Sequence, residues 1–207
     1  MAEKISNKTA FFNPLSKDNP VIVQVLGICS ALAVTAKLEP AIVMGLSVIA
    51  VLAFSCVIIS LIRNTNPNNI RIIVQLVVVA GLVAIVNQLL EAYAYNVSKQ
   101  LSVFVGLIIT NCILMGRLEA FAMSTRPWPA FLDGGGNGLG YTIILVITAF
   151  FRELLGSGTL LGYQVVPQCL YDAGYANNGL MILPPMALIV VACIIWVHRA
   201  HNKDLQD

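Results

Sequence analysis

Long apolar runs separated by short polar segments dominate this chain. Six runs can be distinguished, at about 20–36, 41–62, 70–90, 101–116, 139–151 and 180–197. A membrane helix needs about 20 mostly apolar residues. The pattern therefore predicts an all-α integral membrane protein with six transmembrane helices.

The first and fourth runs are short for a span. The first is interrupted by Gly27 and Ser30, and Pro40 marks a break before the second run because proline cannot continue a helix comfortably. Prolines and glycines also fill the segment 117–138, which we expect to be a loop with Trp128 as an interface anchor. The segment 156–179 is expected to be a second loop.

Composition strengthens the membrane prediction. Hydrophobic residues make up 58% of the 207 residues, charged residues make up 11%, and the mean hydropathy is +0.84, whereas a soluble domain has about 25% charged residues. We therefore expect one membrane domain over 1–207, with a polar arm at 1–19 and a tail at 200–207. The basic residues are spread thinly between apolar runs, so the net charge of +2 gives no indication of nucleic-acid binding.

The distribution of basic residues predicts the orientation. With six spans, both termini lie on one side of the membrane. That side carries nine basic residues, Lys4, Lys8, Lys17, Arg63, Arg71, Arg117, Arg126, Arg199 and Lys203. The other side carries three, Lys37, Lys99 and Arg152. The positive-inside rule places both termini in the cytoplasm.

Two segments repeat one motif. Each contains a cysteine in a Gly-containing apolar run and ends in a cation, a leucine and a glutamate: Cys29 precedes Lys37–Glu39, and Cys112 precedes Arg117–Glu119. The cysteine-to-glutamate spacings differ, 10 residues against 7. We interpret the segments as equivalent positions in two halves of one protein.

The halves are predicted to be 20–98 and 99–199, with three spans each. An odd number of spans forces the halves into opposite orientations, and short or Gly-interrupted segments at matching positions mark the central site of such inverted repeats. Arg63 and Arg152, each at the end of the second span of its half, add weaker support. A pseudo-two-fold axis would bring Cys29 and Cys112 together.

Two converging thiolates could hold half of an iron–sulfur site, which usually needs four cysteines. A second polypeptide could supply the other pair, or Cys56 and Cys193 could complete the set internally. The alternative is that Cys29 and Cys112 are small packing residues. The five cysteines form no zinc-type spacing, and the chain has no catalytic triad or phosphate loop.

The charged ends of the first and fourth runs leave two interpretations open. Lys37 with Glu39, and Arg117 with Glu119, could form local ion pairs, or they could handle a cation or the charge of a cluster. The same alternatives apply to the dipeptide Arg152–Glu153. Three polar residues of the third run are expected to form interhelical hydrogen bonds, Gln75, Asn87 and Gln88.

Four motifs connect the chain to a known family. They are Leu26–Thr35 (LGICSALAVT), Thr110–Ala122 (TNCILMGRLEAFA), Asp133–Tyr141 (DGGGNGLGY) and Phe151–Gly158 (FRELLGSG). With them the chain resembles, over nearly its whole length, the D-subunit family of the bacterial sodium-translocating NADH:quinone oxidoreductases. The homologous E component of the related Rnf complex typically has Cys-Pro where this chain has Cys29–Ser30, so the sodium pump is the better match.

The resemblance implies a six-span inverted repeat with spans one and four shortened. It also implies that the chain pairs with a homologous protein, the E component of the pump, that each partner gives two cysteines to one iron–sulfur centre of 2Fe–2S type, and that Cys29 and Cys112 are this chain's ligands. The remaining components, A, B, C and F, would bind NADH, FAD, FMN and riboflavin, and electrons would reach ubiquinone while sodium is exported. The expected location is the bacterial inner membrane, with no activity for the chain alone.

Other functions remain open at this stage. The chain could belong to an Rnf ferredoxin:NAD electron-transport complex. It could be a secondary transporter with a mid-membrane site at the same helix breaks, or an inert scaffold within a larger complex.

Overall fold

The computed structural model describes residues 19–63, 70–93, 106–160, 163–164 and 179–201. The helices are α2 (Ile28–Val34), α3 (Leu38–Ile62), α4 (Arg71–Tyr93), a single turn at 106–109, α6 (Cys112–Arg117), the π-helix η1 (Leu118–Ala122), α7 (Pro127–Ser157), the 3₁₀ turn η2 (Gly179–Ile182) and α9 (Pro184–His201). Two short antiparallel strands, β1 (Thr159–Leu160) and β2 (Tyr163–Gln164), follow α7. Apart from this strand pair, the regular elements of the described chain are helices, as predicted.

Three of the described helices are long and apolar enough to cross a membrane: Leu38–Ile62, Arg71–Ala92 and Pro127–Ser157. The apolar helix α9 is shorter. At about 1.5 Å per residue, the 31 residues of α7 exceed a hydrocarbon core of about 30 Å. Six spans remain a prediction.

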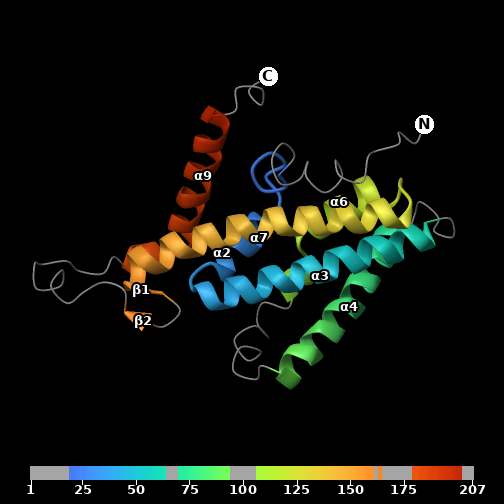
Figure 1. Cartoon of the computed structure of the whole chain (residues 1–207), viewed down its shortest axis with the longest axis horizontal. Helices are drawn as coiled ribbons and strands as arrows, with labels where there is room; N and C mark the ends of the chain where they lie inside the picture. Colours follow the sequence, from blue (N-terminus) through green and yellow to red (C-terminus); the bar gives the residue numbers. More distant parts are fainter. Residues whose placement is uncertain (1–18, 64–69, 94–105, 161–162, 165–178, 202–207) are drawn as a thin grey trace, which may run out of the picture.

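The centre of the fold is the antiparallel pair of α3 and α7, which lie side by side (Figure 1). Small residues allow the two backbones to approach closely. A methyl group added at Gly138 would lie 2.9 Å from Ile49 Cα, and one added at Gly134 would lie 3.0 Å from the Leu52 carbonyl oxygen. Between membrane helices, such close packing replaces the hydrophobic driving force that water provides elsewhere.

The glycine-rich segment is therefore helical. The prediction of a loop over 117–138 is wrong except at the turn 123–126, because η1 covers 118–122 and α7 begins at Pro127. Pro127 and Pro129 lie in the first turn of α7, where the helix needs no amide donor. The glycines at 134 and 138 form a Gly-xxx-Gly pattern that packs against α3. Pro40 likewise lies in the first turn of α3 rather than before it.

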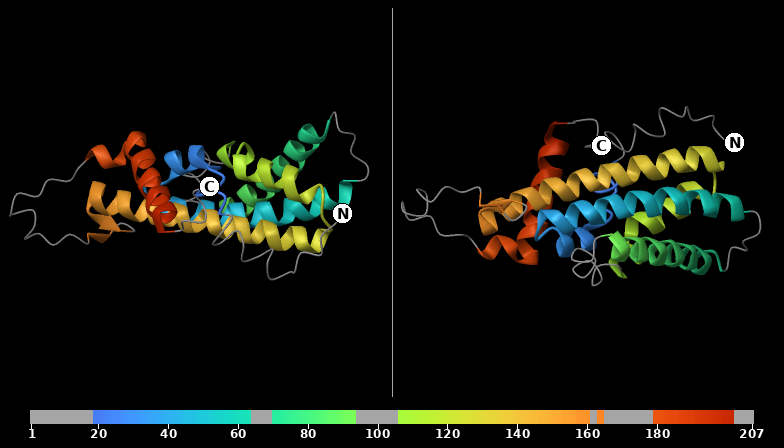
Figure 2. Two further views of the ribbon diagram at one scale, coloured as in Figure 1. Left: turned by 90° about the horizontal axis from the view of Figure 1, so that it is seen from above. Right: turned by 60° about the horizontal axis from the view of Figure 1, so that its bottom comes forward.

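The short helices lie against this central pair. In the left view of Figure 2, α2 and the segment around α6 lie on the same side of α3 and α7, with α4 towards one end and α9 towards the other. Both α4 and α9 expose large apolar side chains, among them Ile73, Val77, Leu188 and Trp196. Such outward faces suit contact with lipid or with other membrane proteins.

We expect Gly138→Ala to lower the stability of the chain by about 1–3 kcal/mol, the usual range for overpacking. The added methyl group meets the Cα of Ile49 in α3, a backbone atom that cannot rotate away. Gly81→Ala is the matched control, because nothing lies within 4 Å of that position. Thermal unfolding in detergent measures both variants. Equal melting temperatures for the two would contradict the close approach of α3 and α7.

Candidate functional site

The two predicted cysteines lie side by side. Cys29 Sγ and Cys112 Sγ are 3.9 Å apart although the residues are separated by 83 positions in the chain. Cys29 lies in the first turn of α2, and Cys112 is the first residue of α6. Both are exposed on the surface of the chain. Their role as metal ligands remains a prediction.

The separation of the two sulfurs fits a shared tetrahedral metal. With metal–sulfur bonds of about 2.3 Å, two sulfurs at the corners of a tetrahedron lie about 3.8 Å apart. A disulfide would require about 2.05 Å, so the two residues are free thiols here. One iron atom could therefore bind both thiolates with almost no rearrangement.

The described residues provide only half of a four-ligand set. No group of three or more His, Cys, Asp or Glu side chains converges anywhere in the described ranges. Cys56 is buried in α3, and Cys193 is exposed on α9, so the internal completion with these two is not formed. Cys169 lies outside the described residues. Any further ligands have to come from elsewhere.

Gly27 and Asn111 shape the two helix starts. Gly27 precedes α2 with φ +81°, a left-handed conformation that glycine adopts without strain. A methyl group there would lie 2.6 Å from Ile113 Cδ1, so glycine also lets the first segment pack against the second. Asn111 caps α6, because its side-chain oxygen accepts a hydrogen bond from Ile113 N at 3.2 Å.

Arg152 of α7 holds the C-terminal end of α2. This arginine is only 1% exposed. Its guanidinium donates to Thr35 Oγ1 and to the Leu32 carbonyl at the end of α2. It also donates to the carbonyls of Met181 (3.1 Å) and Ile182 (2.6 Å) in η2. A cation at these carbonyl groups complements the negative end of the helix.

The neighbouring Glu153 caps the next helix. Its Oε2 accepts a hydrogen bond of 2.6 Å from Leu38 N, the first residue of α3. A carboxylate at a helix N-terminus satisfies a free amide and the positive end of the dipole. In the described structure, Arg152 and Glu153 together fix the turn between α2 and α3. Neither cation handling nor an ion pair is needed to explain these two residues.

Arg63, at the end of α3, likewise donates to a backbone carbonyl at the end of a short helical segment. Its Nη1 donates to the carbonyl of Thr125 at 2.9 Å, just after η1, and Ser60 Oγ donates to the same oxygen at 2.7 Å. Both α3 and α7 thus have an arginine near the C-terminal end that donates to backbone carbonyls at the end of a short helical segment: Arg63 after η1, and Arg152 in α2.

The two cation-Leu-Glu triplets differ in structure. Lys37–Glu39 begins α3, whereas Arg117–Glu119 ends α6 and enters η1, before α7. The local ion pair between Arg117 and Glu119 is not formed. Arg117 bonds to Asp133, with Nε 3.0 Å from Oδ2. In the described part of the chain, Lys37 and Glu39 are exposed and form no salt bridge.

Glu119 instead joins η1 to α4. It forms a salt bridge with Arg71 and accepts a hydrogen bond from Gln75 Nε2 at 3.1 Å. The predicted interhelical role of Gln75 is thus confirmed. Asn87 Oδ1 is buried and has no hydrogen-bond partner among the described residues.

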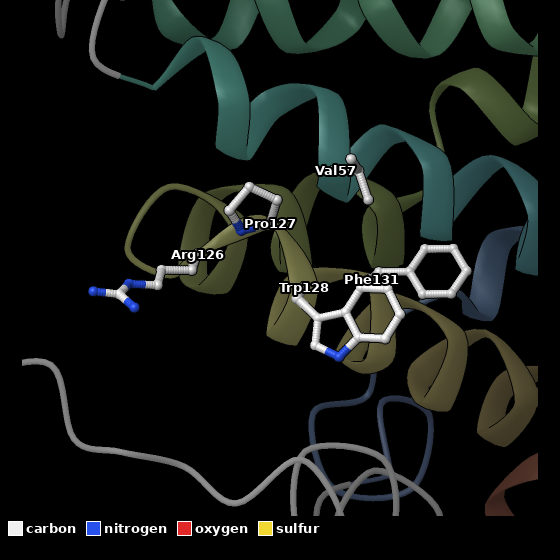
Figure 3. A pocket seen from close by; sticks show the side chains of 5 residues that line it. All are labelled: Val57, Arg126, Pro127, Trp128 and Phe131. Atoms are coloured by element: carbon white, nitrogen blue, oxygen red, sulfur yellow. The ribbon is translucent and has the colours of Figure 1, made fainter.

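An apolar groove of about 480 Å³ lies at the start of α7. Val57, Arg126, Pro127, Trp128 and Phe131 line it (Figure 3), and the rings of Trp128 and Phe131 stack with centroids 6.4 Å apart. The groove includes neither thiol. The exposed indole of Trp128 agrees with its predicted place at a membrane interface.

Comparison with known proteins gives consistent matches over nearly the full length. A family model described as "Rnf-Nqr subunit, membrane protein" matches residues 7–195. The D component of a Na(+)-translocating NADH-quinone reductase from Photobacterium profundum is 55% identical over 96% of this chain and 95% of its own length. The corresponding D components from Aeromonas hydrophila (55% identical, 99% of this chain and 96% of the relative) and Shewanella sp. W3-18-1 (52%, 99% and 97%) are similar as well.

We expect a short bifunctional thiol reagent to join Cys29 to Cys112 within one chain, because their sulfurs are 3.9 Å apart and exposed. Peptide mass spectrometry of the reduced, metal-depleted chain measures the cross-link. Cys193, also exposed, is the internal control and should react with one end of the reagent only. Failure to join Cys29 and Cys112 would contradict the described arrangement of α2 and α6.

We expect Arg152→Met to destabilise the chain by several kcal/mol, because five oxygen acceptors around the buried guanidinium lose a charged donor. Arg126→Met is the control, since Arg126 is exposed. Thermal unfolding of the purified chain compares the two variants. A melting temperature for Arg152→Met as high as that for Arg126→Met would show that Arg152 does not hold the end of α2.

Proposed function

The chain belongs to the Rnf-Nqr family of membrane proteins, and from this premise we propose that it is the D component of a Na⁺-translocating NADH:quinone reductase. In this proposal it relays electrons across the bacterial inner membrane by holding half of an iron–sulfur centre, and the relay is coupled to sodium export. The observation that carries the proposal is the exposed thiol pair, Cys29 and Cys112, with its 3.9 Å separation.

The exposure of the thiols supports a shared centre. Two thiolates account for half of the ligands that a 2Fe–2S centre takes, and a pair on the surface is open to a partner. The homologous E component is the proposed partner, with its own pair of cysteines. The centre would supply one-electron transfer, while this chain holds two thiolates at a fixed separation and keeps the backbone beneath them rigid.

An inverted repeat gives the proposed arrangement of the chain. Under a pseudo-two-fold axis, α2 corresponds to α6 with η1, α3 to α7, and α4 to α9. The reciprocal contacts of Arg63 and Arg152 support this equivalence, because each arginine reaches the short segment of the opposite half. We propose six spans, with the first and fourth shortened, and both termini in the cytoplasm.

The partners follow from the same proposal. The A, B, C and F components would carry the NADH, FAD, FMN, riboflavin and ubiquinone sites, none of which is proposed for this chain. The Rnf complex is the weaker alternative, because relatives at 52–55% identity over nearly the full length bear the name of the NADH-quinone reductase.

We expect Cys29→Ser and Cys112→Ser to remove the same iron from the purified complex, and the double variant to remove no more than either single variant. The reason is that both thiolates belong to one centre. Iron and acid-labile sulfide analysis, with EPR of the reduced complex, measures the loss. Cys193→Ser, which removes an exposed thiol of α9, is the matched control. A full complement of iron in the assembled double variant would refute the ligand assignment.

A further inference from the structure

We propose that Tyr141 of α7 is a positioning residue for the thiol pair, acting through the hydroxyl of Ser30. The inference rests on the proposed function, because it concerns how the two ligand segments are held at a fixed separation. Tyr141 OH lies 2.6 Å from Ser30 Oγ, and Asn111 Nδ2 lies 3.3 Å from the same oxygen. Ser30 follows Cys29, and Asn111 precedes Cys112.

The directions of these hydrogen bonds follow from counting protons. Ser30 has one hydroxyl proton, and its Oγ donates to the Gly27 carbonyl at 3.0 Å. Tyr141 OH therefore donates to Ser30 Oγ, and the amide of Asn111 donates to it as well. The Ser30 hydroxyl thus donates one hydrogen bond and accepts two. Its partners come from three segments: Gly27 before α2, Asn111 before α6, and Tyr141 in α7.

The same network fixes both helix starts. The serine hydroxyl is a second donor to the carbonyl of Gly27, the residue before α2, which also accepts from Ala31 N at 3.2 Å. The Asn111 side-chain oxygen accepts from Ile113 N at the start of α6. Tyr141 contributes the anchor from the long helix α7. Its ring also packs against Gly27, where an added methyl group would lie 3.1 Å from Cε2.

Burial makes the network sensitive to the loss of one group. Tyr141, Ser30 and Asn111 are at most 3% exposed, so water cannot readily replace a missing donor, and an unpaired buried acceptor is costly. The thiols themselves are exposed and gain little from packing. The backbone and polar network behind them therefore set their separation within this chain.

The test is Tyr141→Phe in the purified complex, which keeps the ring and removes the donor. Thr148→Val is the matched control: Thr148 is buried on the same helix, and its hydroxyl donates only within α7, to the Ile144 carbonyl at 2.8 Å. We expect Tyr141→Phe to speed iron release to a chelator by roughly fivefold, as for one net hydrogen bond, and to change the EPR line shape of the reduced centre. The control should do neither.

A second measurement does not depend on the metal. In the metal-depleted complex, the rate of Cys29–Cys112 cross-linking by a short bifunctional reagent should fall by about the same factor in Tyr141→Phe. Ser30→Ala should have a similar effect, and the double variant should be no worse than either single variant, because both changes break one network. Additive losses, or rates equal to the control, would overturn the proposal.

The two measurements separate this inference from the proposed function. If the wild-type complex holds no iron at Cys29 and Cys112 but Tyr141→Phe still slows the cross-link, the ligand assignment fails and the positioning role stands. If iron depends on both cysteines but Tyr141→Phe leaves iron release, EPR and cross-linking unchanged, the positioning role fails and the proposed function stands.

Discussion

Where helices are interrupted in an apolar chain, the free backbone amides and carbonyls need hydrogen-bond partners, and the rest of the structure depends on this need. A membrane offers no water to pair with free amides and carbonyls, so broken helices are tolerated only where protein or a cavity satisfies them. The interrupted segments here are α2 and α6 with η1, and the long helices supply the partners. Arg152 and Glu153 act from α7, and Arg63 acts from α3.

This constraint also explains how two cysteines far apart in the chain come to lie together. The glycines at 134 and 138 bring α3 and α7 into close contact, and the side chains of these two helices then hold the short segments on one side of the pair. Gly27 and Asn111 begin those segments in a way that places one thiol beside the other. The result is an exposed pair of sulfurs on short segments that are hydrogen-bonded to the long helices, as the proposed shared ligand set would require.

The sequence predicted those features that depend on short-range pattern. The short, glycine-containing segments that carry Cys29 and Cys112, and the matching arginines, could be recognised because each occurs twice in the sequence. Local propensity predicts the wrong structure for the glycine-rich start of α7, because it treats glycine as a helix breaker, whereas the close contact with α3 requires glycine there. The Gly-xxx-Gly spacing was the available signal.

The partners of charged and polar side chains could not be predicted. Arg117 pairs with Asp133, and Glu119 pairs with Arg71. These contacts are set by how α6 lies against α7 and how η1 lies against α4, rather than by proximity in sequence. The Tyr141–Ser30 bond joins residues 111 positions apart, and no spacing rule indicates it.

The most direct test of the account is residue-resolved alkylation of the intact complex, read by mass spectrometry before and after iron is removed by a chelator. We predict that Cys29 and Cys112 are both protected while iron is bound and become reactive together when it leaves, whereas Cys193 reacts to the same extent throughout. Alkylation of either Cys29 or Cys112 with the iron fully retained would contradict the central claim that the two thiolates bind one metal centre.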